Sequence, residues 1–108
     1  MRITLGTSFK VANIKYNVRW MTDVEEQVDA ECLGSSEASK SLIKIRRGES
    51  RNTTEHVWFH ELVHTVLSAL GREELNSDEG FVDGLAGLFH QAMKSKRGNL
   101  YDERETGI

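Results

Sequence analysis

The sequence is poor in several residue types, and each shortage limits what the protein can be. Its 108 residues include no proline and one cysteine, Cys32, so no internal disulfide can form. A lone cysteine is compatible with a reducing cytoplasm. No apolar run is long enough to cross a bilayer, and residues 1–5 lack the apolar stretch of a signal peptide. We therefore expect a cytoplasmic protein without a membrane partner.

Basic residues are not in surplus either. Fourteen Lys and Arg residues against seventeen Asp and Glu residues give a net charge of −3. Nucleic-acid-binding proteins usually carry a basic patch, so we expect no nucleic-acid partner. A chain of this length forms one small domain with a modest core, which we assign to residues 1–98. The polar residues 99–108 are expected to form a flexible tail.

One stretch of the chain, Glu55–Leu70, contains residues that can carry chemistry. It includes a His-Glu-x-x-His motif at residues 60–64. Residues four apart share one face of a helix, so His60 and His64 can direct their imidazoles towards one ion. Glu61, the next residue after His60, can reach a water held on that ion. This spacing is what zinc-assisted hydrolysis requires, and it predicts a Zn²⁺ site with Glu61 as the general base.

The residues around the motif favour a helix. Apolar residues recur there at helical spacing and predict a buried stripe, with the two histidines at its margin. The members of this stripe are Phe59, Leu62, Val63, Val66 and Leu70.

A catalytic zinc site needs a third protein ligand and leaves its fourth position to water. Gly71 is interpreted as the residue that closes the first helix, and a second amphipathic helix is predicted to end near Lys96. Near the start of that helix, Glu79 and Asp83 are four residues apart and lie outside its apolar stripe. Asp78 is the rival carboxylate, so all three acids are candidates for the third ligand.

Together these residues resemble the gluzincin arrangement of zinc peptidases. The pattern looks like that of the small phage and prokaryotic minigluzincins and, more loosely, the ImmA/IrrE-type peptidases. The resemblance implies Glu79 as the third ligand and Asp83 as the carboxylate that orients a ligating histidine. It also implies an endopeptidase that acts on proteins or peptides in the cytoplasm of a bacterium or a phage-infected cell. The similarity covers the two helices well and the residues before them only in outline.

The residues before the motif have the pattern of short strands. Alternating apolar residues predict half-buried strands at Ile14–Trp20 and Leu42–Arg47, and Asp29–Gly34 is a weaker candidate. Thr22–Gln27 fits either a loop or one helical turn. We therefore predict an α+β fold, with a small antiparallel or mixed sheet followed by two packed helices, as in a minimal zincin. The resemblance implies an edge strand that pairs with an extended substrate, and chain order assigns this edge to Asp29–Gly34.

Zinc peptidases usually add a Tyr, His or Arg that stabilises the oxyanion. Tyr16, Tyr101 and His56 are the candidates, and His56, one turn before the motif, can border the cleft. His90 is too far along the second helix to share the ion, so it is interpreted as structural or exposed. No motif supports an oxyanion residue, which leaves an alternative hypothesis: a zinc-stabilised regulatory or binding module with little turnover.

Overall fold

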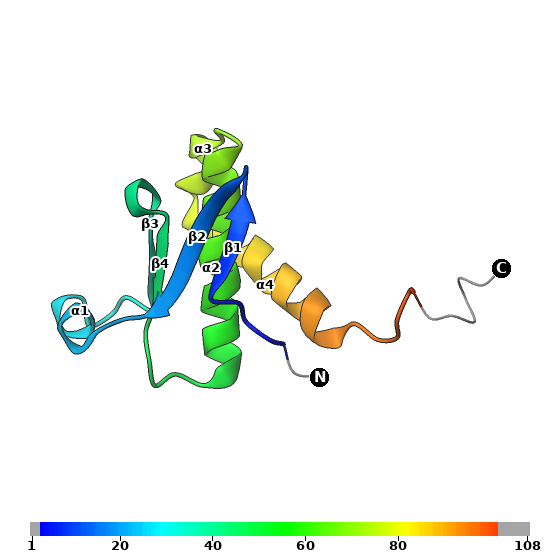
Figure 1. The fold of residues 1–108 in the computed structure, drawn as a ribbon, viewed down its shortest axis with the longest axis horizontal. Helices are drawn as coiled ribbons and strands as arrows, with labels where there is room; N and C mark the ends of the chain where they lie inside the picture. Colours follow the sequence, from blue (N-terminus) through cyan, green and yellow to red (C-terminus); the bar gives the residue numbers. More distant parts are fainter. Residues whose placement is uncertain (1–2, 102–108) are drawn as a thin grey trace.

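The computed structural model describes residues 3–101 and has an α+β fold, with helices packed against a four-stranded mixed sheet (Figure 1). The strand order is β1-β2-β4-β3. The pair β2–β4 is parallel, whereas β1–β2 and β3–β4 are antiparallel. The strands are β1 (Ser8–Val11), β2 (Ile14–Trp20), β3 (Gly34–Glu37) and β4 (Leu42–Ile45). The predicted fold class is therefore confirmed, and the sheet is mixed rather than purely antiparallel.

The helices follow the strands in the chain, apart from α1 and η1, which lie between strands. They are α1 (Asp23–Val28), η1 (Ala38–Lys40), α2 (Arg51–Ala69), α3 (Glu73–Asn76) and α4 (Glu79–Ser95). Gly71 follows α2 with a φ of 70°, a left-handed conformation that ends the helix as predicted. Nowhere in residues 3–101 is a helix both long and apolar enough to cross a membrane.

Helix α2 is buried on two sides rather than along the single predicted stripe. Towards the sheet, Val57 packs against Ile43 and Ile45 of β4. Of the predicted stripe, Val66 and Leu70 are 37% and 67% exposed. The cluster between α2 and α4 consists of Phe59, Val63, Leu67, Val82 and Ala86. The helix pattern was correct, but the sequence did not reveal that α2 has two packing partners.

A polar contact also joins α2 to α4. His90 Nε2 lies 2.8 Å from Glu55 Oε1, and these residues are 6% and 2% exposed. The ring of His90 stacks on Phe59 at a centroid distance of 5.8 Å. The His90 ring and the Glu55 carboxylate are hydrogen-bonded to each other, so burial of the pair leaves neither group without a partner. His90 is thus a structural residue of the helix interface.

The edge strand differs from the prediction. Strand β3 begins at Gly34, where the predicted strand Asp29–Gly34 was to end, and it continues to Glu37. The preceding loop is held by the Arg46 side chain, whose Nε donates to the Cys32 carbonyl at 2.8 Å. This tertiary contact fixes residues 29–33 as a loop, and register with β4 places the strand after them. The predicted edge position beside β4 is confirmed, although the residues that form it are different.

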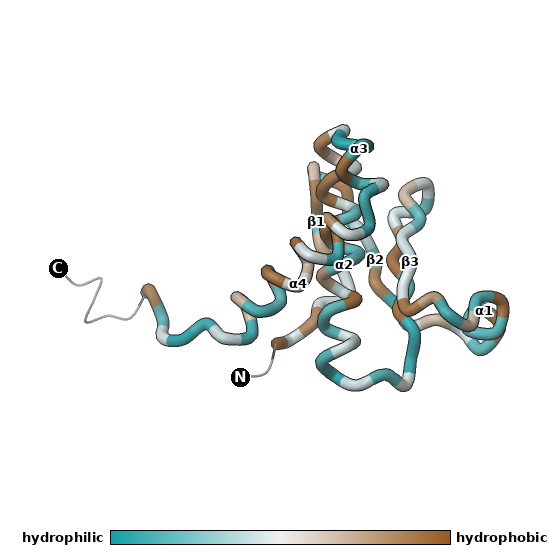
Figure 2. Tube along the Cα trace, turned by 180° about the vertical axis from the view of Figure 1, so that it is seen from behind, coloured by the Kyte–Doolittle hydropathy of each residue, from teal (hydrophilic) through white to brown (hydrophobic). Residues whose placement is uncertain are grey.

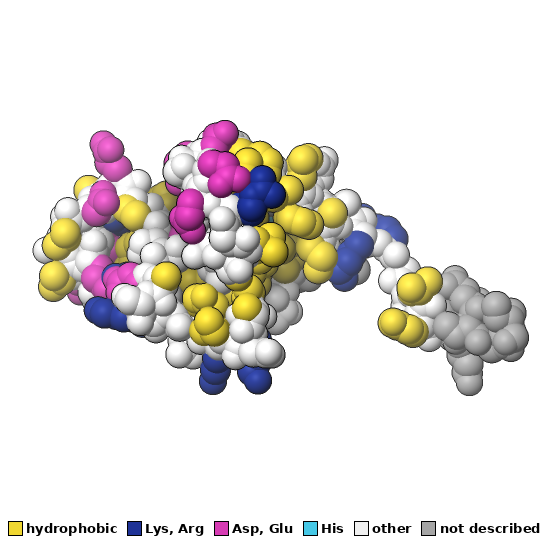
Figure 3. Space-filling model, turned by 90° about the horizontal axis from the view of Figure 1, so that it is seen from above, with side chains coloured by type: hydrophobic (Ala, Val, Ile, Leu, Met, Phe, Trp, Pro, Cys, Tyr) yellow, Lys and Arg dark blue, Asp and Glu magenta, His cyan; other side chains and the backbone are white. Residues whose placement is uncertain are grey.

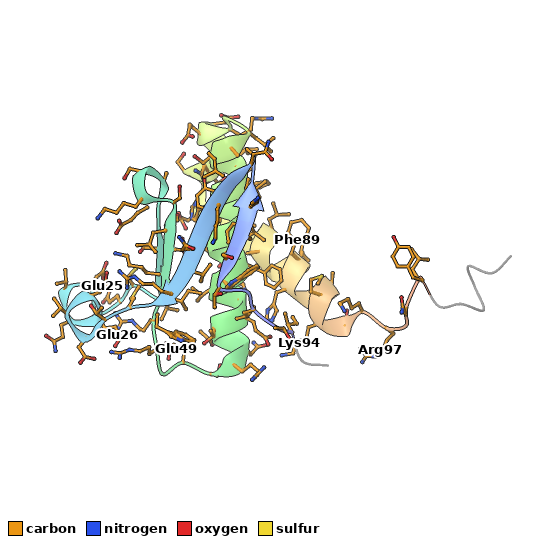
Figure 4. All side chains as sticks on the ribbon, in the orientation of Figure 1. Glu25, Glu26, Glu49, Phe89, Lys94 and Arg97 are labelled. Atoms are coloured by element: carbon orange, nitrogen blue, oxygen red, sulfur yellow. The ribbon has the colours of Figure 1, made fainter. Side chains whose placement is uncertain are left out.

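Helix α1 has no buried residue and is held by its cap and by ion pairs. Its capping box joins Thr22 and Glu25, and Arg19 donates to the Glu25 carboxylate at 2.8 Å. Arg47 donates its backbone N–H and its guanidinium to Glu26. Figure 4 labels Glu25 and Glu26 on this helix. At the other end of the chain, Leu100 and Tyr101 are exposed, and residues 102–108 of the predicted tail lie outside the described residues.

The contact between Glu26 and Arg47 predicts an acid-sensitive contribution to stability. Hydrogen bonds from Arg47 lower the pKa of Glu26 to about 2, from an ordinary value of 4.5. A lowered folded pKa stabilises the protein above pH 4.5, and this stabilisation is lost as the pH falls towards 2. Glu26→Gln should therefore lower the urea midpoint at pH 7, and the difference from wild type should shrink steadily below pH 4.5. Arg47→Gln should behave alike, and a difference that stays constant down to pH 3 would contradict this account.

Candidate metal centre

Helix α2 and the first turn of α4 bring two histidines and one carboxylate together. His60 Nε2 lies 3.1 Å from Glu79 Oε2, and His64 Nε2 lies 3.2 Å from Glu79 Oε1. One ligand atom from each of the three residues falls within 4.8 Å of the others. The two imidazoles come from neighbouring turns of α2, with ring centroids 4.9 Å apart. The residues predicted as zinc ligands therefore converge on one point.

Each of the two histidines is oriented by a hydrogen bond on its other ring nitrogen. His60 Nδ1 lies 3.1 Å from Asp83 Oδ1, and His64 Nδ1 lies 2.6 Å from Asn76 Oδ1. Because both acceptors are oxygens, each Nδ1 can donate a proton to its partner. On the other side of each ring, Nε2 faces a Glu79 oxygen, and a cation between these atoms would be bound through the Nε2 lone pair.

The short connection between α2 and α4 sets the position of Glu79. Asp78 caps α4, because its Oδ1 accepts the Phe81 backbone N–H at 3.0 Å. This contact occupies one oxygen of Asp78 and begins α4 at Glu79. Asp83, one turn later, faces the far side of His60. Of the three acids considered as third ligand, Glu79 is the one grouped with both histidines of the motif.

His56 is brought to the site through Asp83. Its Nε2 donates to Asp83 Oδ1 at 2.8 Å, so this oxygen accepts hydrogen bonds from two imidazoles. His56, His60 and Asp83 form a second group with ligand atoms within 4.8 Å. The other oxyanion candidates are not brought to the site. Tyr16 lies on β2, where its ring stacks on Phe9, and Tyr101 is 82% exposed beyond α4.

Glu61 lies beneath the edge strand and is 5% exposed. Burial raises the pKa of its carboxyl, and the nearby His60 and His64 oppose this shift. The Ser36 hydroxyl of β3 donates a hydrogen bond that also opposes it. A cavity of about 170 Å³ adjoins the carboxylate. Its lining consists of Leu33, Gly34, His56, Val57, His60 and Glu61.

Two residues of this site were missed in the sequence. Asn76 was not predicted, although a ligating histidine needs an acceptor for its second nitrogen and Asn76 lies three residues before Glu79. Ser36 was not predicted either. No local pattern reveals it, because its contact with Glu61 depends on the register of β3 on β4.

Comparison of the chain with protein-family models, with curated proteins and with solved structures finds no match.

The close approach of β3 to α2 gives a prediction about Gly34. A Cβ at this position would lie 2.5 Å from Val57 Cγ1 and 3.3 Å from Glu61 Oε2. Gly34→Ala should therefore push β3 from α2 and lower the free energy of unfolding by about 1–3 kcal/mol. Adding Val57→Ala should recover part of this loss by making room for the new methyl group. Urea denaturation measures both effects.

Gly84→Ala is the matched control. A Cβ there meets nothing within 4 Å, and the residue lies inside α4. Its helix propensity should then raise stability by up to about 1 kcal/mol. Equal effects of the two glycine substitutions would show that β3 does not pack closely on α2.

Proposed function

We propose that the protein is a zinc-dependent endopeptidase, a minimal enzyme of the gluzincin type. The observation that carries this proposal is the convergence of His60, His64 and Glu79 beside a buried carboxylate, Glu61, under an edge strand. The proposal places the enzyme in the cytoplasm of a bacterium or a phage-infected cell, where its single Cys32 would stay reduced.

The donor atoms fit zinc by their chemistry. Two imidazole nitrogens and one carboxylate oxygen are a ligand set that catalytic zinc uses, and the oxygen acceptors at Nδ1 favour the tautomer in which Nε2 binds a metal. His60, His64 and Glu79 would hold the ion, while Asp83 and Asn76 would keep the two rings in place. A zinc ion bound there polarises a peptide carbonyl and makes a water molecule more acidic.

Glu61 is the residue that moves the proton in this proposal. Its carboxylate takes a proton from the attacking water as the new C–O bond forms. It then delivers the proton to the amide nitrogen as the C–N bond breaks, and it ends the cycle ionised again. Nearly complete burial keeps this carboxylate away from bulk water.

The open edge of β3 supports an extended peptide as the substrate. Arg46 N–H donates to the Leu33 carbonyl at 2.9 Å, which identifies this residue pair as hydrogen-bonded across the β3–β4 ladder. In an antiparallel ladder such pairs alternate, so the backbone groups of Gly34 and Ser36 point away from β4, where the Gly34 carbonyl also accepts from Cys32 Sγ at 2.9 Å. A substrate strand that pairs there would lie above Glu61, as in strand addition.

A zinc-stabilised binding module is the second candidate. It is favoured by one observation. His56 lines the cavity beside Glu61, but its Nε2 already donates to Asp83, and Tyr16 and Tyr101 lie elsewhere. Such a module would bind zinc and gain folding stability from it without turnover. The next experiment separates the two candidates.

Glu61→Gln should retain zinc but lose hydrolysis. Removal of a general base should slow cleavage of an unfolded, fluorescently labelled substrate by about 10²- to 10⁴-fold. Zinc content, measured by atomic emission, should stay at one ion per chain. Glu49→Gln, in the loop before α2 (Figure 4), is the control and should retain full activity. Unchanged cleavage in Glu61→Gln would end the proposal, and zinc binding without any cleavage in wild type would favour the binding module.

Asp83→Ala should weaken zinc binding by about 10- to 100-fold, because His60 loses the acceptor that fixes its tautomer. Competition with a chromophoric chelator measures this affinity. Glu73→Ala, which removes an exposed acid of α3, should leave it unchanged. Equal affinities for all three proteins would mean that Asp83 does not orient a ligand.

A further inference from the structure

Helix α4 has a wider apolar face than α2 covers. Its buried residues are Val82, Ala86 and His90, which follow each other at intervals of four residues and pack towards α2. A second row of apolar residues runs beside them, and we call this row the α4 stripe. In Figure 2 the tube of α4 alternates between hydrophobic and hydrophilic positions. The α4 stripe consists of Phe81, Leu85, Leu88, Phe89 and Met93. All of these except Leu85, which is half-buried, are 40% to 65% exposed.

The α4 stripe borders an apolar cavity of about 440 Å³. Leu85, Phe89 and Met93 line it on the α4 side, and Leu62 and Val66 line it on the α2 side. Figure 3 shows hydrophobic side chains gathered on the side of the body from which the C-terminal end projects, and Figure 4 shows Phe89 on this part of α4. A continuous apolar surface of this kind usually marks a docking site.

The charges at the two ends of α4 are opposite. Asp78 lies just before its start, whereas Lys96 and Arg97 follow its last residue, Ser95. When two such helices pack antiparallel, the acidic start of each lies beside the basic end of the other. The helix dipoles then also oppose each other favourably.

The α4 stripe is self-complementary in this antiparallel arrangement. With a twofold axis at the level of Gly87, Phe81 of one chain lies opposite Met93 of the other, and Leu85 lies opposite Phe89. A twofold interface of this kind uses the same patch on both copies, so each contact occurs twice. The charge pattern and the apolar pattern therefore both favour the α4 helix of a second copy of the chain, in antiparallel orientation.

We propose that the α4 stripe binds a second copy of the chain, with the two α4 helices packed antiparallel in a twofold-symmetric dimer. Glu79 and Asp83 point from another side of α4 towards the histidines of α2. The dimer therefore leaves both candidate metal centres accessible, and it does not depend on the proposed enzymatic function.

Sedimentation velocity of the full, zinc-loaded chain over a range of concentrations tests the dimer. The expected mass is twice that of the 12.2 kDa chain. Leu88→Glu should weaken self-association at least about 30-fold, which corresponds to the loss of an interface hot spot. Leu70→Glu is the matched control, because Leu70 is as exposed as Leu88 (67% and 65%) but lies at the end of α2. It should remain dimeric, and circular dichroism should show that both variants are folded.

Disulfide cross-linking tests the orientation. Phe81→Cys and Met93→Cys chains, both carrying Cys32→Ser, should form a mixed disulfide when combined. A disulfide between two Phe81→Cys chains would indicate parallel helices and overturn the proposal. A wild-type monomer at all concentrations would also overturn it, as would a dimer that Leu88→Glu leaves intact. A monomer that binds vesicles of phosphatidylglycerol and phosphatidylethanolamine would assign the α4 stripe to a membrane surface instead.

Discussion

Contact between α2 and its neighbours on two sides positions every functional group of this protein. Towards the sheet, Val57 and Glu61 pack beneath the edge strand, and towards α4 the histidines meet the carboxylates. A helix that is covered twice can rotate very little, because rotation would open one interface or the other. Fixed rotation is what lets side chains four residues apart meet a single carboxylate from another helix.

The polar side chains of the candidate site hydrogen-bond to one another. Asp83 accepts from two imidazoles, Asn76 accepts from a third, and the Ser36 hydroxyl donates to Glu61. The described residues contain no buried side-chain polar atom without a hydrogen-bond partner. Such networks specify one arrangement of the helices, because a shift of either helix would leave several groups unsatisfied at once.

The grouping of His60, His64 and Glu79 could be predicted from the sequence because it depends on local geometry. Spacing of four residues within a helix determines how His60 and His64 lie, and the short connection between α2 and α4 limits where Glu79 can be. The edge strand could not be placed from its own residues, since Gly34–Glu37 has low strand propensity and obtains its conformation from pairing with β4. The role of His56 was unclear for the same reason, because its partner Asp83 lies 27 residues away. Contacts between residues far apart in the sequence therefore determine the position of the edge strand and the partner of His56, which the sequence did not predict.

The arrangement of the site along the chain also bears on how the protein folds. The two histidines of the motif, their hydrogen-bond acceptors and Glu79 all fall within residues 60–83, a single helical hairpin. The sheet requires β2 to join β4 across an insertion that contains α1 and β3. Closing a short loop costs less chain entropy than closing a long one. The hairpin can therefore bring its histidines and Glu79 together early, while Glu61 becomes shielded from solvent only when β3 docks.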